Sequence, residues 1–136
     1  MEEFLQSEKT TWILDLRKSA FQELLQSDFP NPSMEMWRKI SLSNFDPLNF
    51  SFYRDEKKNF PIPKNVSVKD FRDVSGNSLE ILIKFLQTLL EKSKGDFFQN
   101  FNFAFFTFGV FVEIEESCKV EEPILIRYEL PQNQNC

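Results

Sequence analysis

The chain contains no histidine, three glycines and two cysteines among its 136 residues, and these shortages exclude several kinds of chemistry. Without histidine, a metal site would have to use Cys118, Cys136 and carboxylates, and the two cysteines do not have the spacing of zinc ligands. Three glycines leave little material for a phosphate cradle, and no P-loop, G-x-G-x-x-G or nucleophile elbow is found. We therefore expect no catalytic residue, no metal site and no cofactor bound by the chain itself.

The remaining reactive side chains favour ordinary roles. Cys118 is expected to be a plain thiol in a turn between strands, and Cys136 lies in a polar tail at residues 131–136. Adjacent acidic residues at 115–116 and 121–122 tend to point apart on strands, so we expect them to be solvated. An enzyme is not expected, and a redox thiol at Cys118 is the one enzymatic alternative left open.

Acidic residues outnumber basic ones, with 21 Asp and Glu against 16 Lys and Arg, so the net charge is −5 and the pI is about 4.8. Nucleic-acid binding depends on clusters of Lys and Arg, so we exclude DNA and RNA as partners. The acidic N-terminus has no basic region followed by an apolar run, which argues against a signal peptide. No apolar run approaches the roughly 18 residues of a membrane span. A cytoplasmic location is the resulting expectation, with no membrane as partner.

Aromatic residues are abundant instead, with 17 phenylalanines and a helix-forming apolar pattern over much of the chain. Apolar residues at spacings of three and four predict a helix at about 9–27, capped by Thr10 or Thr11, and a second helix at 79–91, capped by Asn77 or Ser78 and stopped by Gly95. The stripe of the first comprises Trp12, Ile13, Leu16, Ala20, Phe21, Leu24 and Leu25. The stripe of the second comprises Leu79, Leu82, Ile83, Leu86, Leu89 and Leu90.

Between these helices, prolines and polar runs predict irregular structure at about 46–75, with a strand through Val66 and Val68. Asn31 followed by Pro32 is typical of a helix start and predicts a short helix carrying Met34, Trp37 and Ile40. Trp37 and Arg38 have two open interpretations, a surface recognition pair or, for Trp37, simple packing into the core.

Eight phenylalanines lie between Phe97 and Phe111, in the stretch DFFQNFNFAFFTFGVFVEIEE at 96–116. The spacing predicts a helix over 97–105 with Asp96 as its cap, because Phe97, Phe98, Phe101 and Phe105 recur at helical intervals. Alternation from Phe106 to Ile114 predicts a strand. A second extended run follows at 123–128. The phenylalanine cluster is thus expected to be a junction between helix and strand. We expect its rings to form part of the core more readily than a ligand pocket.

Two segments carry a resemblance to a known family. The first is FPNPSMEMWRKISL at 29–42, in which the motif residues are Phe29, Pro30, Glu35, Trp37, Arg38 and Leu42. The second is DFFQNFNFAFFTFGVFVEIEESCKVEEPILI at 96–126, in which they are Phe98, Phe101, Asn102, Ala104, Gly109, Glu122, Pro123 and Ile124. In this order, with a helix between them, the segments resemble the SufB/SufD proteins of iron–sulfur cluster assembly, and SufD in particular.

The resemblance implies an N-terminal helical region, then a long right-handed parallel β-helix, then a C-terminal helical segment that contacts the SufC ATPase. By that analogy residues 1–105 are the helical region and residues 106–130 begin the β-helix. The cluster-building Cys and His positions of the family lie in later rungs, so none can be assigned here. The implied partners are SufB-like and SufC-like proteins. The iron–sulfur cluster and ATP enter only through that complex.

We therefore expect an α+β fold, with a helical bundle-like region followed by a few strands resembling the first rung of a β-helix. A terminal rung leaves apolar surface and strand edges open, and the aromatic residues are expected to cap it. The proposed cap and interaction residues are Trp37, Arg38, Phe97, Phe98, Phe101, Asn102, Phe106 and Phe108. Trp37 and Arg38 would anchor the helical region. The expected function is a non-catalytic scaffold part in iron–sulfur cluster assembly.

Two alternatives stay open at this point. The first is a small acidic protein–protein interaction module unrelated to iron–sulfur clusters, whose aromatic strand pairs with the edge strand of a partner. Exposed strand edges also allow a homodimer. The second concerns the chain itself, which is expected to be a fragment, a truncated product or an excised domain, with a short independent paralogue as the other option.

Overall fold

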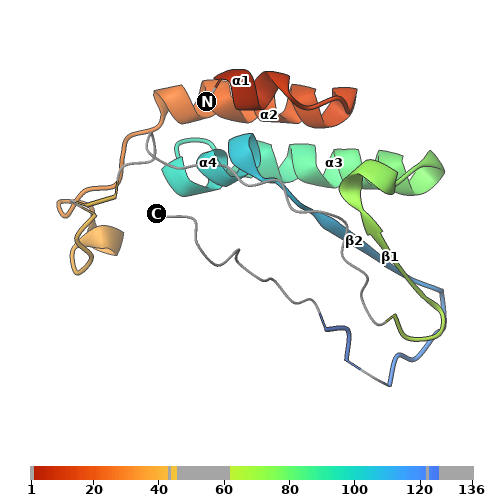
Figure 1. The fold of residues 1–136 in the computed structure, drawn as a ribbon. Coiled ribbons are helices and arrows are strands. Elements are labelled where there is room, and N and C mark those ends of the chain that lie inside the picture. The colour runs from red at the N-terminus through yellow and green to blue at the C-terminus, as the bar shows by residue number, and fades with distance from the viewer. Residues whose placement is uncertain (1, 43, 46–61, 122, 126–136) are drawn as a thin grey trace, which may run out of the picture.

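The computed structural model describes residues 2–42, 44–45, 62–121 and 123–125. Figure 1 shows a layer of helices with a narrow two-stranded ribbon projecting from one end of it. Along the chain come α1 (Glu2–Gln6), α2 (Thr11–Gln26), the 3-10 turn η1 (Glu35–Trp37), β1 (Val66–Asp70), the 3-10 turn η3 (Phe71–Asp73), α3 (Gly76–Lys92), α4 (Phe97–Phe105) and β2 (Val110–Ile114). The expected α+β class is confirmed.

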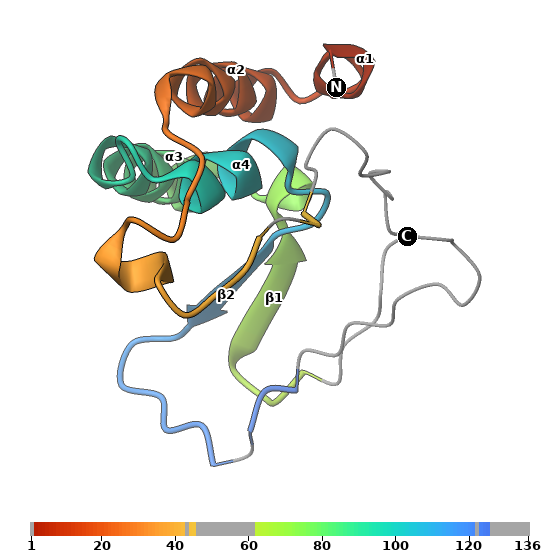
Figure 2. The same cartoon turned by 90° about the vertical axis from the view of Figure 1, so that its left-hand side faces the viewer.

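The helical core lies between α2 and the pair formed by α3 and α4, and Figure 2, in the view along the helices, shows α2 lying over that pair. The predicted first helix is confirmed as α2, and its buried apolar side chains are Ile13, Leu16, Ala20 and Leu24. Leu25 departs from the prediction because it is 66% exposed. Helix α1 was not predicted, since five residues are too few to show a helical period, yet its Leu5 is buried in the same core.

Helix α3 is the predicted second helix, but it begins at Gly76, three residues before the predicted start. Ser75 occupies the N-cap position, so the expected caps Asn77 and Ser78 lie inside the first turn. The Ser78 hydroxyl instead donates to the Glu113 carboxylate at 2.8 Å, which ties the start of α3 to β2. Gly95 follows the helix with a φ of +80°, a backbone conformation that favours glycine.

Helix α4 begins as predicted, because the Asp96 carboxylate accepts a hydrogen bond from the Gln99 amide at 2.9 Å. The strand that follows starts at Val110 and not at Phe106. The Phe106 carbonyl accepts from the Arg17 guanidinium of α2 and so bonds outside the ribbon. The Gly109 carbonyl accepts from the Phe71 amide at 2.9 Å, in register with the pairing of β1 and β2.

The predicted strand through Val66 and Val68 is confirmed as β1. Of the stretch at 46–75 that was expected to be irregular, residues 66–73 form β1 and η3, and residues 46–61 lie outside the described residues. β1 and β2 pair antiparallel, with Val66 opposite Ile114, Val68 opposite Val112 and Asp70 opposite Val110. The ribbon therefore joins a segment before α3 to a segment after α4. Within the described residues these two strands form the sheet, and a parallel β-helix rung is not part of it.

The short helix expected after Pro32 is reduced to the single turn η1. The helix is short because the backbone of Met34 is extended (φ −77°, ψ 127°), and an extended residue interrupts any helix that starts at Pro32. Asn31 does act as a local cap, because its side-chain oxygen accepts from the Ser33 amide at 2.9 Å. Of the second extended run, residues 123–125 have no regular structure, and 126–128 lie outside the described residues, as does the tail at 131–136.

Gly109 is required by close packing, and we predict that Gly109→Ala destabilises the fold. A Cβ atom at this position would overlap the Phe71 ring. Overpacking of this kind costs about 1–3 kcal/mol, which chemical denaturation measures directly. Shortening the opposing side chain in a Gly109→Ala, Phe71→Leu double variant is expected to recover part of the loss. Equal stability of Gly109→Ala and the wild type would contradict the packing seen here.

Candidate functional site

Aromatic rings gather at the N-terminal end of α4, and we call this group the aromatic end cluster: Phe29, Trp37, Phe45, Phe97 and Phe98. The Phe97 ring meets Phe29 edge-on at 4.9 Å between centroids. Phe98 lies 5.2 Å from Trp37 and 5.4 Å from Phe45. Because Trp37 and Phe45 follow α2 and Phe98 starts α4, the cluster fastens the segment after α2 to the helical layer.

The structure brings some of the predicted interaction residues together and separates others. Trp37 and Phe98 are in contact, whereas Arg38 is exposed. The Phe101 ring stacks on Phe97 and also contacts the ring of Phe105, which is buried in the core. The Asn102 side chain is exposed. Its backbone carbonyl accepts a hydrogen bond from the Phe106 amide at the end of α4.

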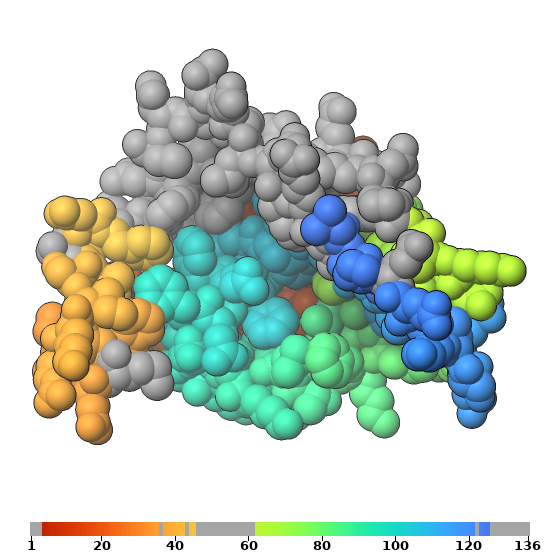
Figure 3. All heavy atoms as spheres, turned by 90° about the horizontal axis from the view of Figure 1, so that it is seen from below, coloured from red at the N-terminus to blue at the C-terminus, as the bar shows by residue number. Residues whose placement is uncertain are grey.

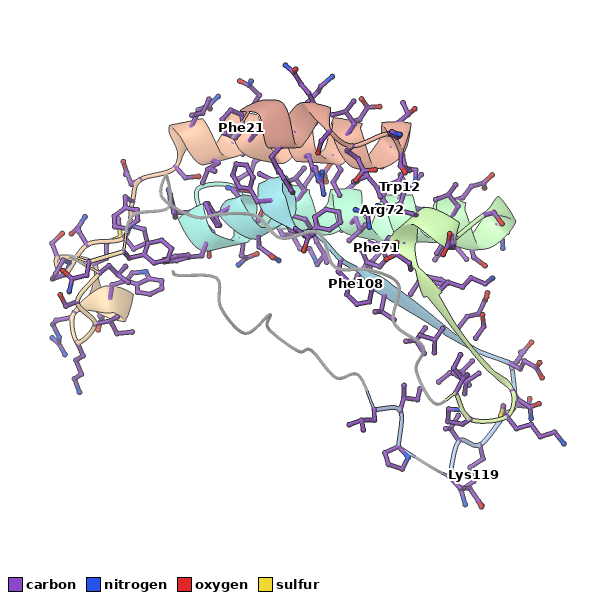
Figure 4. All side chains as sticks on the ribbon, in the orientation of Figure 1. Trp12, Phe21, Phe71, Arg72, Phe108 and Lys119 are labelled. Carbon is purple, nitrogen blue, oxygen red and sulfur yellow. The ribbon has the colours of Figure 1, made fainter. Side chains whose placement is uncertain are left out.

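Phe106 and Phe108 lie at the other end of α4, where the helical layer meets the ribbon. The Phe106 ring meets Phe71 edge-on at 6.1 Å, and the Phe71 ring in turn lies 6.3 Å from Trp12. Figure 4 shows Phe71 and Arg72 below the Trp12 end of α2, and Phe108 below them toward the ribbon. Phe108 is half-buried. A proposed cap made of all these phenylalanines thus spans both ends of α4.

A buried arginine lies at the centre of this second junction and was not predicted. Arg17 is 1% exposed, and its guanidinium lies 4.8 Å from the Phe4 ring and 5.2 Å from the Phe106 ring. Its Nη2 donates to the Phe106 carbonyl at 2.5 Å. Its Nη1 lies 3.5 Å from the Glu8 carboxylate. One side chain therefore joins α1, α2 and the chain after α4.

Glu8 is the acidic partner of two arginines. Its Oε2 lies 3.0 Å from Nη2 of Arg72, and its Oε1 accepts from the amides of Lys9 and Thr10 at 3.1 Å. Glu8 thus binds the two backbone amides that lead into α2, whereas the N-cap residue Thr10 makes no side-chain cap hydrogen bond. Burial raises the pKa of Glu8, but the hydrogen bonds from Arg72 and Thr10 and the charges of both arginines outweigh burial and lower the pKa to about 2.

A sequence signal for this ion network exists in the apolar stripe of α2. Arg17 lies four residues after Ile13 and three before Ala20, so it shares the buried side of the helix. A charged residue at such a position is almost never fully buried unless it is paired. The identity of its partners has no such signal, because Glu8 and Arg72 are 64 residues apart along the chain.

A second polar group inside the core is built around Asn100, which is fully buried. Its Nδ2 donates to the Ser27 hydroxyl and to the Ser93 carbonyl, both at 3.1 Å, and its Oδ1 accepts from the Ser93 hydroxyl at 2.8 Å. These bonds hold together the ends of α2 and α3 and the first turn of α4. The residue that the family motif singles out, Asn102, is the exposed neighbour on the same helix.

We predict that Asn100→Ala and Asn102→Ala differ strongly in stability. Removing the Asn100 amide leaves buried serine groups without their partner, at a cost of about 1–3 kcal/mol. Asn102→Ala changes an exposed side chain and should stay within about 0.5 kcal/mol of the wild type. Urea denaturation of the two variants provides a matched comparison. A larger loss at Asn102 than at Asn100 would contradict the described network.

The described residues offer little for catalysis. They contain no group of three or more His, Cys, Asp or Glu residues that could hold a metal ion. Cys118 is a half-buried free thiol. A groove of about 150 Å³ lies between α2 and α3, lined by Trp12, Asp15, Leu16, Ser19, Ile83, Leu86, Gln87 and Leu90. That volume is well below the usual 300–1,000 Å³ of a ligand pocket. None of the described helices has the length and apolar character needed to cross a membrane.

These features define an α+β domain whose best-built polar sites hold its own elements together. The family described as "SufBD protein N-terminal region" matches residues 39–126, which is more than half of the chain. The chain belongs to the SufB/SufD family and corresponds to its N-terminal region. The match begins at Lys39, just after Trp37 and Arg38, and covers α3, α4 and both strands. No curated protein and no solved structure matches the chain.

Proposed function

We propose that the protein is a non-catalytic scaffold part in iron–sulfur cluster assembly, acting with SufB-like and SufC-like proteins in the cytoplasm. The observation that carries the proposal is the family match over residues 39–126. The cluster and ATP would be handled by the partners. This chain would contribute a rigid helical layer, fastened by the aromatic end cluster and by the Arg17 network.

The ribbon formed by β1 and β2 is the element that we relate to the β-helix of the family. One face of it is largely apolar: it carries Val66, Val68, Val110, Val112 and Ile114, with Asp70 opposite Val110 at one end. A two-stranded ribbon is only marginally stable by itself, and an apolar face needs a further layer. Because β1 and β2 pair antiparallel, we propose that they form the base on which a β-helix of the family type is seated, with the phenylalanines of α4 as the adjoining cap.

A cell-based replacement experiment tests this function. Cells that lack the chain are expected to lose activity of an iron–sulfur enzyme, and the wild-type chain should restore it. Cys118→Ser should restore it equally well, because the role is non-catalytic. Full activity in cells that lack the chain would contradict the role in cluster assembly. Failure of Cys118→Ser alone would instead support the redox-thiol alternative.

The alternative function is a small acidic interaction module unrelated to iron–sulfur clusters. The observation that favours it is the ribbon, since within the described residues β1 and β2 pair only with each other and each has an edge left for another strand. A homodimer formed through these edges is expected from this alternative. It would leave the activity of iron–sulfur enzymes unchanged in the replacement experiment.

A further inference from the structure

Helix α1 is a small element that is anchored through side chains. The Phe4 ring lies 4.8 Å from the Arg17 guanidinium and 6.1 Å from the Phe105 ring, measured to ring centroids. Leu5 is 6% exposed, and Glu8, which follows the helix, is 4% exposed. A helix of five residues is not stable by itself in water. The segment 2–8 is therefore ordered by the site that it fills, in the way that a bound peptide is.

The site that receives this segment is formed by α2, η3 and the end of α4. The guanidinium groups of Arg17 and Arg72 lie 3.5 and 3.0 Å from the Glu8 carboxylate. Arg17 is 1% exposed, and a buried charge without its partner is strongly destabilising. The site therefore requires a segment with a carboxylate at this position, whichever copy of the chain supplies it.

The link between α1 and α2, residues 7–10, is bent but contains no glycine or proline. The Glu8 carboxylate accepts hydrogen bonds from the amides of Lys9 and Thr10 in this bend. Thr10 makes no side-chain cap hydrogen bond, and the first turn of α2 has no acidic residue. Helical backbone geometry through the link would give the first amides of α2 carbonyl partners. The link is thus suited to straighten and to join α1 and α2 into one helix.

We propose that two copies of the chain exchange residues 2–8, so that Phe4, Leu5 and Glu8 of one copy fill the site of the other. The contacts of these side chains are kept, because an exchanged element meets an identical site. Straightening gives up the bonds from Glu8 to the link amides and adds backbone hydrogen bonds of a helix. The occupant is a second copy because the fit of this segment to this site is the one that the structure shows.

This inference goes beyond the assembly role proposed above and does not depend on it. Figures 1 and 2 show α1 on the upper side of the helical layer, whereas the ribbon projects below it. Figure 3, seen from below, shows α3, α4 and the ribbon on the visible face. Exchange through α1 therefore uses a different part of the molecule from the apolar face of the ribbon. It also differs from a homodimer formed by pairing of strand edges.

Size-exclusion chromatography with light scattering tests the exchange, with the full chain in a reducing buffer that prevents disulfide cross-links between copies. The fraction of dimer is expected to rise with protein concentration. Lys9→Pro should raise the dissociation constant of the dimer more than about a hundredfold, because proline interrupts the continued helix in both links. Lys9→Ala is the matched control at the same exposed position and should keep the dimer, because alanine favours a helix.

A second variant, with a short glycine insertion between Lys9 and Thr10, should also be monomeric, because a longer hinge loop relieves the need for exchange. It decides the question if circular dichroism shows that Lys9→Pro does not fold. The wild-type dimer should contain more helix than the monomer. A monomer at every concentration overturns the proposal, and so does a dimer that both link variants leave unchanged, as pairing of ribbon edges predicts. These readouts do not involve iron–sulfur enzymes, so failure here is distinct from failure of the assembly role.

Discussion

Arg17→Ala is expected to lower the free energy of unfolding by about 3–5 kcal/mol, the usual cost of breaking a buried ion pair by removing one partner. The variant leaves the Glu8 carboxylate, which is 4% exposed, without one of its two arginines. It also removes the hydrogen bond to the Phe106 carbonyl and the cation contacts with the Phe4 and Phe106 rings. A loss of this size is comparable with the whole stability of many small domains.

Urea denaturation followed by circular dichroism measures the effect, with Lys18→Ala as the matched control. Lys18 is the exposed neighbour of Arg17 on the same helix, and its replacement should change stability by less than about 0.5 kcal/mol. Arg17→Met combined with Glu8→Gln removes both charges and keeps most of the volume. It is expected to be more stable than Arg17→Ala. Similar stability of Arg17→Ala and Lys18→Ala would contradict the central place of this network.

The second large effect is a loss of stability in acid that depends on Glu8. The folded protein lowers the pKa of Glu8 from 4.5 to about 2, so the folded state favours the ionised carboxylate. That stabilisation is fully present above about pH 4.5 and is lost as the pH falls through about 2. At 1.36 kcal/mol per pKa unit it amounts to about 3 kcal/mol.

Glu8→Gln is the variant that tests this pH dependence. It should be less stable than the wild type near neutral pH, because the Arg17 and Arg72 charges lose their partner. It should also lose less stability than the wild type between about pH 5 and 2, because the titrating group is gone. Glu91→Gln, on the exposed side of α3, is the control that keeps the wild-type slope. Identical slopes for Glu8→Gln and the wild type would show that another group controls the acid transition.

Local patterns predicted the helices well and their ends less well. The periods of α2, α3 and α4 and the Asp96 cap depend on residues close in sequence, which is why they could be read from it. The prediction starts β2 too early, at Phe106, and the cause is tertiary, because the carbonyl of that residue accepts from Arg17 of α2 and not from a neighbouring strand. The pairing of β1 with β2 joins segments on either side of two helices, and alternation alone does not reveal that partner.

The candidate site was also predicted only in part. The number of phenylalanines in the sequence predicted an aromatic cluster, and the contact between Trp37 and Phe98 joins two of the predicted residues. Glu8, Arg72 and Asn100 were not predicted, because each acts through partners far along the chain. The family resemblance pointed to Asn102 as an interaction residue, whereas the asparagine whose side chain is buried is Asn100. Whether the predicted phenylalanines cap a β-helix stays a prediction.

The most direct test of the central claim is co-expression of this chain with the SufB-like and SufC-like proteins of the same cell, followed by size-exclusion chromatography with light scattering. We expect one complex that contains all three chains, whose mass exceeds that of the SufB-like and SufC-like pair by one or more copies of this protein. Elution of the chain by itself, as a monomer or a homodimer, with the other two proteins in a separate peak, would contradict its role as a part of the assembly scaffold.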